Sequence, residues 1–272
     1  GTSNEEESFK VHMQHAVPIS FGCQTAETGM IAKQFADGIF GLIEHEGNAM
    51  LHSMHEAGVV PYHAFSICLN YTGGVLSLGG TALRDDHHLE SMEMIPRFNS
   101  QFFSVGVEAM FLGGNEFVSR EEVALEFSSD GKGAVIDSGT TDTFLPKMFR
   151  ARFAAAWLEI TGREYTNDVE TFTFDEFQNL PVFTVVLKTG YKWVIEPRMY
   201  MEEFIPRKES AVSEQVLDFT DESTWPSYGT RFVNRLYWDE PQGAVFGSNA
   251  MLGHDILFDL ENDMIGFARA SC

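Results

Sequence analysis

Apolar and polar residues alternate with a period of two along most of this chain, which is typical of strands that bury one face. Two hairpins are predicted where such runs flank a short turn, residues 181–188 with 191–196 and residues 255–260 with 264–269. Further strands are predicted between glycine-rich turns, at residues 75–78, 103–107 and 183–187. The pattern therefore predicts a mostly β fold.

One longer segment has helical periodicity instead. Between residues 146 and 161, Phe149, Phe153 and Trp157 recur at every fourth position. A proline opens the segment and Gly162 follows it, as at many helix ends. We predict a helix with one buried stripe.

A shorter helix is predicted over residues 48–57, ending before Gly58. His52 and His55 would share one of its faces. Because no third ligand stands at a helpful spacing, an ordinary surface pair is favoured over a metal site, and no metal is predicted.

Composition narrows the class of protein. With 272 residues and 44% hydrophobic content, the chain can bury a real core. Its formal charge of -22 would repel nucleic acid and anionic membrane surfaces, so neither is an expected partner. Such acidity fits an acidic or lumenal compartment, although halophilic solvation would also produce it. The acidic start, without methionine or signal peptide, suggests a trimmed or partial product.

Cys23, Cys68 and Cys272 are an odd, widely spaced set without a CxxC motif. In an oxidising compartment the leftover cysteine would bridge to a segment outside this sequence, whereas in the cytosol all three would be buried thiols. The pairing is left open. A single N-x-[ST] sequon, Asn70-Tyr71-Thr72, adds slightly to a secretory interpretation.

The candidate chemistry lies where the apolar run 134–136 ends at Asp137 and enters the polar string Ser138-Gly139-Thr140-Thr141. Burial and hydroxyl hydrogen bonds could hold this carboxylate at a chosen ionisation for acid and base work, while Gly139 lets the backbone turn sharply. The alternative is a capped strand-to-helix turn, in which Asp137 only binds backbone amides.

This string, followed by a helix, resembles the active-site loop of pepsin-like aspartic proteases. Residues 244–247 and the hairpin 256–268 resemble the carboxyl-terminal signature of that family, in which an apolar pair and a glycine pass beneath the catalytic aspartate. Residues 35–42 resemble the equivalent segment of the first lobe, and residues 65–80 its closing hairpin. Three separated motifs occur in the order of the family.

The resemblance implies an all-β, bilobal pepsin-like fold with an incomplete first lobe and an essentially whole second lobe. Residues 1–90 would be the carboxyl-terminal part of the first lobe, and residues 91–272 the second lobe. The polar stretch 84–90 would lie in the link between the lobes, with strands resuming at Gln101.

The resemblance also implies an aspartic-type endopeptidase, in which two carboxylates activate a water without any cofactor. Asp137 would be one of the pair; the other is absent, since this sequence has one Asp-[Ser/Thr]-Gly string. Ser138 would brace the loop, Gly139 would approach the substrate backbone, Thr140 would hydrogen-bond the carboxylate, and Thr141 would line the cleft.

The expected partner is a polypeptide substrate, and the missing first-lobe segment would be needed to complete the active site. This chain alone should be nearly inert. The competing hypothesis is a non-catalytic, peptide-binding pseudoprotease. Pairing of two Asp137 loops in a homodimer is disfavoured, because the chain already carries part of both lobes. Localisation in the secretory pathway, lumenal or extracellular, is expected, with a possible membrane anchor beyond Cys272.

Overall fold

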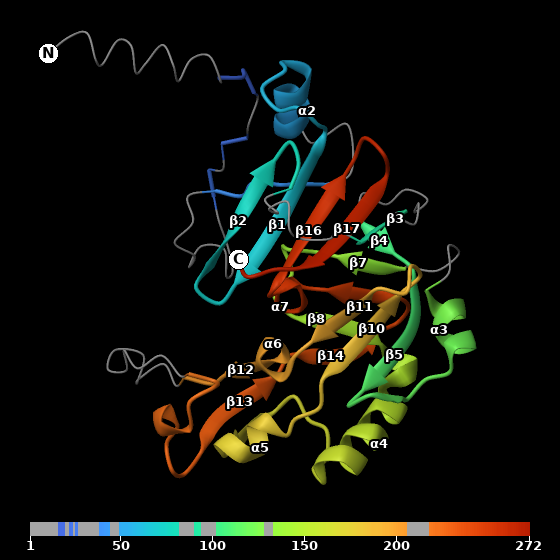
Figure 1. The fold of residues 1–272 in the computed structure, drawn as a ribbon, viewed down its shortest axis with the longest axis vertical. Helices are drawn as coiled ribbons and strands as arrows, with labels where there is room; N and C mark the ends of the chain where they lie inside the picture. Colours follow the sequence, from blue (N-terminus) through green and yellow to red (C-terminus); the bar gives the residue numbers. More distant parts are fainter. Residues whose placement is uncertain are drawn as a thin grey trace, which may run out of the picture.

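Strands dominate the chain, as the alternating pattern predicts (Figure 1). The computed structural model describes residues 16–19, 22–23, 25–26, 38–43, 49–81, 90–93, 102–127, 133–205 and 218–272. In these ranges the strands form four hydrogen-bonded sheets. The prediction of a mostly β chain is confirmed.

The first sheet joins segments from both ends of the described chain (Figure 1). Its strands are antiparallel, and Cys68 of one hairpin stands opposite Asp255 of the other. The two hairpins are those predicted around residues 65–80 and 255–269. In spatial order the strands are β2 (Gly73–Leu78), β1 (Ala64–Asn70), β16 (His254–Asp259), β17 (Met264–Arg269) and β3 (Glu90–Glu93).

Strand β3 corrects the sequence prediction, which had strands resuming only at Gln101. Glu90 pairs with Phe267, and Glu93 pairs with Met264. The backbone of β17 supplies the hydrogen-bonding partner, so a polar segment without apolar alternation still forms a strand. Residues 82–89 and 94–101, which make up the rest of the predicted link, lie outside the described residues.

The predicted functional string connects two strands of a second sheet, β7 and β8. This sheet contains both parallel and antiparallel pairs. Strand β15 is parallel to β7, with Phe246 opposite Ile136, and β14 is parallel to β8. Such parallel pairing requires crossover connections through other elements. In spatial order its strands are β14 (Leu236–Glu240), β8 (Thr143–Pro146), β15 (Ala244–Phe246), β7 (Ala134–Ile136) and β4 (Ser104–Val105).

The predicted single strand 103–107 is wrong, because the chain changes sheet at Gly106. Strand β4 pairs with β7 on one side of this glycine, whereas the next strand pairs with β10 on the other side. Val105 and Val107 are both fully buried, so the apolar pattern continues across the break and hides it. A Cβ at Gly106 would lie 2.5 Å from the Lys188 side chain. Glycine at this position avoids that steric clash.

The remaining strands build two smaller sheets. The predicted hairpin 181–196 is confirmed, with Val185 opposite Trp193. One sheet contains β11 (Lys192–Ile195), β10 (Phe183–Leu187), β5 (Val107–Leu112) and β6 (Asn115–Glu116). The other contains β12 (Met201–Glu203), β13 (Thr230–Asn234) and β9 (Val169–Phe172).

The predicted long helix forms as a 3-10 turn, η2 (Lys147–Phe149), followed by α4 (Arg150–Thr161). Phe149, Phe153 and Trp157 are buried, and Gly162 ends the helix with φ of 68°. The other helices are α2 (Ala49–Glu56), α3 (Arg120–Glu126), α5 (Phe174–Gln178), α6 (Pro197–Tyr200), α7 (Ser248–Met251) and the 3-10 turn η3 (Glu222–Thr224).

Helix α2 brings its two histidines against a third. The ring centroids of His52 and His55 each lie 5.7 Å from that of His63, which precedes β1. Within the described ranges, no group of His, Cys, Asp or Glu has an arrangement that could hold a metal ion. Among the described helices, none combines the length and apolar character needed to cross a membrane.

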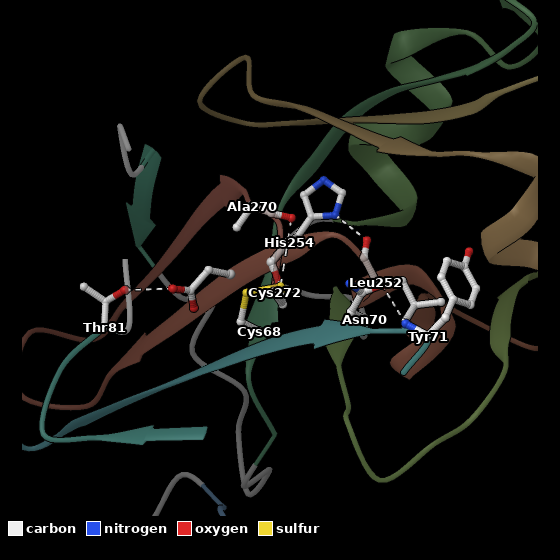
Figure 2. The surroundings of a disulfide bond; sticks show 9 residues. Cys68, Asn70, Tyr71, Thr81, Leu252, His254, Ala270 and Cys272 are labelled. Carbon is white, nitrogen blue, oxygen red and sulfur yellow. Dashed lines mark hydrogen bonds between the residues drawn. A yellow bond between two sulfur atoms is a disulfide. The ribbon is translucent and has the colours of Figure 1, made fainter. Parts of the chain in front are cut away.

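The disulfide pairing that the sequence left open joins Cys68 on β1 to Cys272 (Figure 2). Their Cα atoms lie 5.5 Å apart, across a sequence separation of 204. Cys23 is a free, exposed cysteine. The end of the chain is therefore covalently tied to the hairpin formed by β1 and β2.

Candidate active-site loop

Asp137 stands at the exit of β7, where strands on both sides fix the backbone. The amide of Ile136 donates to the carbonyl of Phe103 at 2.9 Å, and that of Asp137 donates to Phe246 at 3.0 Å. The three apolar residues of β7 are buried, and Asp137, which follows them, is half-buried. The sheet therefore carries this carboxyl group from the core to the surface.

The predicted site residues Gly139 and Thr140 both hold the Asp137 carboxyl group. The amide of Gly139 donates to Oδ1 at 2.8 Å, and the hydroxyl of Thr140 donates to Oδ2 at 2.7 Å. The Thr140 amide also donates to the Asp137 carbonyl at 3.2 Å. One donor on each oxygen fixes the orientation of the carboxyl plane, as an acid or base in a site requires.

The chain turns at Ser138 and Gly139, as the sequence predicts. The sharp turn does not place Gly139 at positive φ. A Cβ at this position would instead lie 3.1 Å from Oδ1 of Asp137. Glycine therefore lets the amide approach the carboxylate closely.

The segment after β15 closes under the loop, as the resemblance of residues 244–247 implied. The amide of Ser248 donates to the Thr140 carbonyl at 2.7 Å. A Cβ on Gly247 would lie 2.2 Å from the Asp142 carbonyl oxygen and 2.6 Å from that of Thr140. Because the φ of Gly247 is an ordinary -81°, space rather than backbone conformation demands glycine here.

An ion network beside the loop was missed by the sequence analysis. The Arg235 guanidinium lies 3.8 Å from the Asp142 carboxylate and also pairs with Glu202. Burial raises the pKa of Asp142, an effect that Arg235 partly offsets. The position of Asp142, directly after the predicted site string, could have drawn attention to it. Arg235 follows β13 and has no comparable signal in the sequence.

Two cavities meet at Ser138. A wide cleft of about 1490 Å³ is bordered by Ser138, Thr141 and Asp142 of the loop, and on the opposite side by residues of β1 and β2 such as Leu69. A small pocket of about 80 Å³ contains Asp137 and Ser138. Its other lining residues are apolar, namely Leu42, Ile43, Phe65, Ile67, Phe102, Phe103, Ile136 and Phe258. Ser138 and Thr141 are exposed.

The first-lobe motif is described only from Gly38 onward, and residues 35–37 lie outside the described residues. Its Leu42 borders both cavities, so the motif approaches the Asp137 loop. Among the described residues, no atom lies within 4 Å of a Cβ placed on Gly41. The neighbouring side chains of Ile39 and Phe40 are 77% and 43% exposed.

The sequence profile of the eukaryotic aspartyl protease family matches residues 6–270, and the chain belongs to this family. The predicted family and its pepsin-like, all-β fold are thereby confirmed.

Individual relatives agree with this assignment. The chain is 23% identical to gastricsin of Callithrix jacchus over 264 residues, which is 92% of this chain and 59% of gastricsin. It is 23% identical to aspartic proteinase 36 of Arabidopsis thaliana, covering 94% of this chain and 50% of the relative. It is 26% identical to aspartic protease 5 of Toxoplasma gondii, covering 92% and 23%. The chain thus spans about half the length of the first two relatives.

Proposed function

We propose that this chain is part of an aspartic-type endopeptidase and that Asp137 is one of its two catalytic aspartates. The observation that carries the proposal is the hydrogen bonding of the Asp137 carboxyl group by Gly139 and Thr140, at the meeting point of two cavities. Asp137 lines the small pocket and its neighbour Ser138 borders both cavities, a position that a capped turn alone does not require. Membership of the aspartyl protease family supports the same chemistry.

In this mechanism two neighbouring carboxyl groups share one proton, because both cannot be ionised so close together. A water held between them loses a proton to one carboxylate and attacks the scissile carbonyl, while the other protonates the developing oxyanion. Gly139 and Thr140 would keep Asp137 in position for this transfer. Ser138 and Thr141, exposed at the cleft, would brace the loop and contact the peptide.

We propose that the second carboxylate comes from polypeptide outside this sequence. In the described part of the chain, the lining of the small pocket holds Asp137 as its single carboxylate. No described residue packs against Gly41, and Ile39 and Phe40 are exposed, which supports a further loop packed against this motif. We accordingly assign residues 1–90 to the first lobe and residues 91–272 to the second.

A cleavage assay on the longer natural product tests this proposal. The wild-type protein should hydrolyse an unstructured polypeptide at acidic pH, and pepstatin should inhibit the hydrolysis. Asp137→Ala should lower kcat/KM on the order of a thousandfold while leaving the folding transition intact. Full activity of Asp137→Ala would remove Asp137 from the mechanism.

The second candidate is a peptide-binding protein without catalysis, favoured by the single carboxylate in the described pocket. Extended peptides could still bind in the wide cleft through backbone hydrogen bonds. In that case the longer product would bind peptides and cleave none, and Asp137→Ala would not change the yield of cleavage products.

Localisation in the secretory pathway completes the proposal, and the disulfide between Cys68 and Cys272 supports it. A membrane anchor beyond Cys272 stays a prediction.

A further inference from the structure

The tight turn between β1 and β2 contains the one N-x-[ST] tripeptide of the sequence, Asn70-Tyr71-Thr72. Asn70 pairs with Gly73 across the hairpin, so Tyr71 and Thr72 form a two-residue turn. Asn70 and Thr72 are both exposed. The acceptor asparagine and the hydroxyl residue that the motif requires therefore remain at the surface of the folded protein.

The side chain of Asn70 leaves its amide nitrogen available. Oδ1 accepts a hydrogen bond from the Tyr71 amide at 2.8 Å, and no described residue accepts one from Nδ2. The Tyr71 ring packs instead toward Phe219, with centroids 6.3 Å apart, and toward the Arg198 guanidinium at 5.7 Å. Asn70 itself is exposed at the end of β1, so a bulky substituent can extend into solvent.

The same strand carries independent information about the compartment. Cys68, two residues before Asn70, is bonded to Cys272, and Figure 2 shows Asn70 and Tyr71 near this disulfide. Disulfides persist in oxidising compartments and are rare in the cytosol. The lumen of the endoplasmic reticulum, where disulfides form, is also where asparagine is glycosylated. A chance sequon would have no reason to coincide with an oxidising environment.

We infer that Asn70 carries an N-linked glycan. In this step Nδ2 of Asn70 displaces the pyrophosphate of a lipid-linked oligosaccharide. A C–N bond forms at the anomeric carbon, the C–O bond to the pyrophosphate breaks, and the amide proton passes to a base. The inference does not depend on the role of Asp137.

The test uses the full-length product, expressed with its own amino terminus in a eukaryotic cell. Treatment with peptide N-glycosidase should increase its gel mobility, and mass spectrometry should find Asn70 converted to Asp. Asn70→Gln and Thr72→Ala should each reduce the mobility change by that of one glycan, and Thr72→Ala should leave Asn70 unmodified in its peptide. Thr72→Ser, which preserves the motif, should retain it.

The wild-type peptide decides the matter even if a variant fails to accumulate. Recovery of the peptide around Asn70 wholly unmodified, from protein whose Cys68–Cys272 bond has formed, would overturn the inference. A mobility change of the same size in the wild type, Asn70→Gln and Thr72→Ala would place the glycan elsewhere and overturn it as well.

Discussion

Gly247 and Gly41 belong to the two motifs that resemble equivalent segments of the second and first lobes, but they differ in how closely other atoms approach them. Gly247 is packed so tightly under the Asp137 loop that a Cβ would lie 2.2 Å from a backbone oxygen. A Cβ on Gly41, in the corresponding first-lobe motif, would have no atom of the described ranges within 4 Å. The described residues therefore pack tightly against Gly247 beneath the Asp137 loop, whereas none of them packs against Gly41.

This contrast supports the proposal that the chain folds around Asp137 but needs a further segment for catalysis. The closed region, formed by the Asp137 loop and Gly247, draws its contacts from β4, β7 and β15. The open region, formed by residues 38–43 and the β1–β2 hairpin, is attached to the rest of the chain through pairing with β16 and through the disulfide.

The largest effect is expected from breaking the covalent attachment of the open region. Replacing Cys68 and Cys272 together by alanine should lower the free energy of unfolding by about 4 kcal/mol, since the bond constrains a very long loop. Denaturant titration measures this loss. Hydrogen exchange should increase in β1 more than in β7. Cys23→Ala, at a free and exposed cysteine, is the control and should change stability little. An equal loss in both variants would contradict the role of the disulfide.

Gly247→Ala tests the closed region. It should lower the free energy of unfolding by about 3 kcal/mol, because two backbone carbonyls would have to move. Gly41→Ala is the matched control and should leave the unfolding free energy of this chain nearly unchanged. In the longer natural product, Gly41→Ala should become destabilising, since the missing loop would fill that space. Equal costs at both glycines in this chain would break the comparison.

Thr140→Val removes the hydroxyl that donates to Oδ2 of Asp137 and should lower kcat/KM of the longer product about tenfold. Steady-state kinetics on a peptide substrate measures this effect. Thr184→Val, in strand β10, is the control for losing a threonine hydroxyl in a strand and should leave kcat/KM unchanged. If both variants kept wild-type kinetics, the hydrogen bond would have no catalytic importance.

Acidification should lower the free energy of unfolding by a smaller amount, through His254 on the strand that pairs with β1. Burial lowers the pKa of His254, which lies on β16 beside the disulfide (Figure 2). The unfolded chain therefore binds a proton more readily, and the unfolding free energy should fall as the pH decreases from about 7 to about 5. His254→Gln should flatten this dependence in chemical denaturation experiments. An unchanged slope in the variant would assign the acid sensitivity to other groups.

Local sequence patterns predicted those parts of the structure that are determined by residues close together in the sequence. The turn at Thr189-Gly190, the stripe of α4 and the string after Asp137 are all short-range features, and each formed as expected. Long-range contacts could not be read in this way. The partner of Cys68, the ion pair of Arg235 with Asp142 and the change of sheet at Gly106 depend on segments distant in sequence. Periodicity contains no information about such partners.

The central claim is that the Asp137 loop is one half of an active site whose other half lies outside this sequence. The most direct measurement compares peptide hydrolysis by this 272-residue chain and by the longer natural product, each with and without Asp137→Asn. We predict background hydrolysis by the chain alone and Asp137-dependent hydrolysis by the longer product. Asp137-dependent hydrolysis by the 272-residue chain alone would contradict the account.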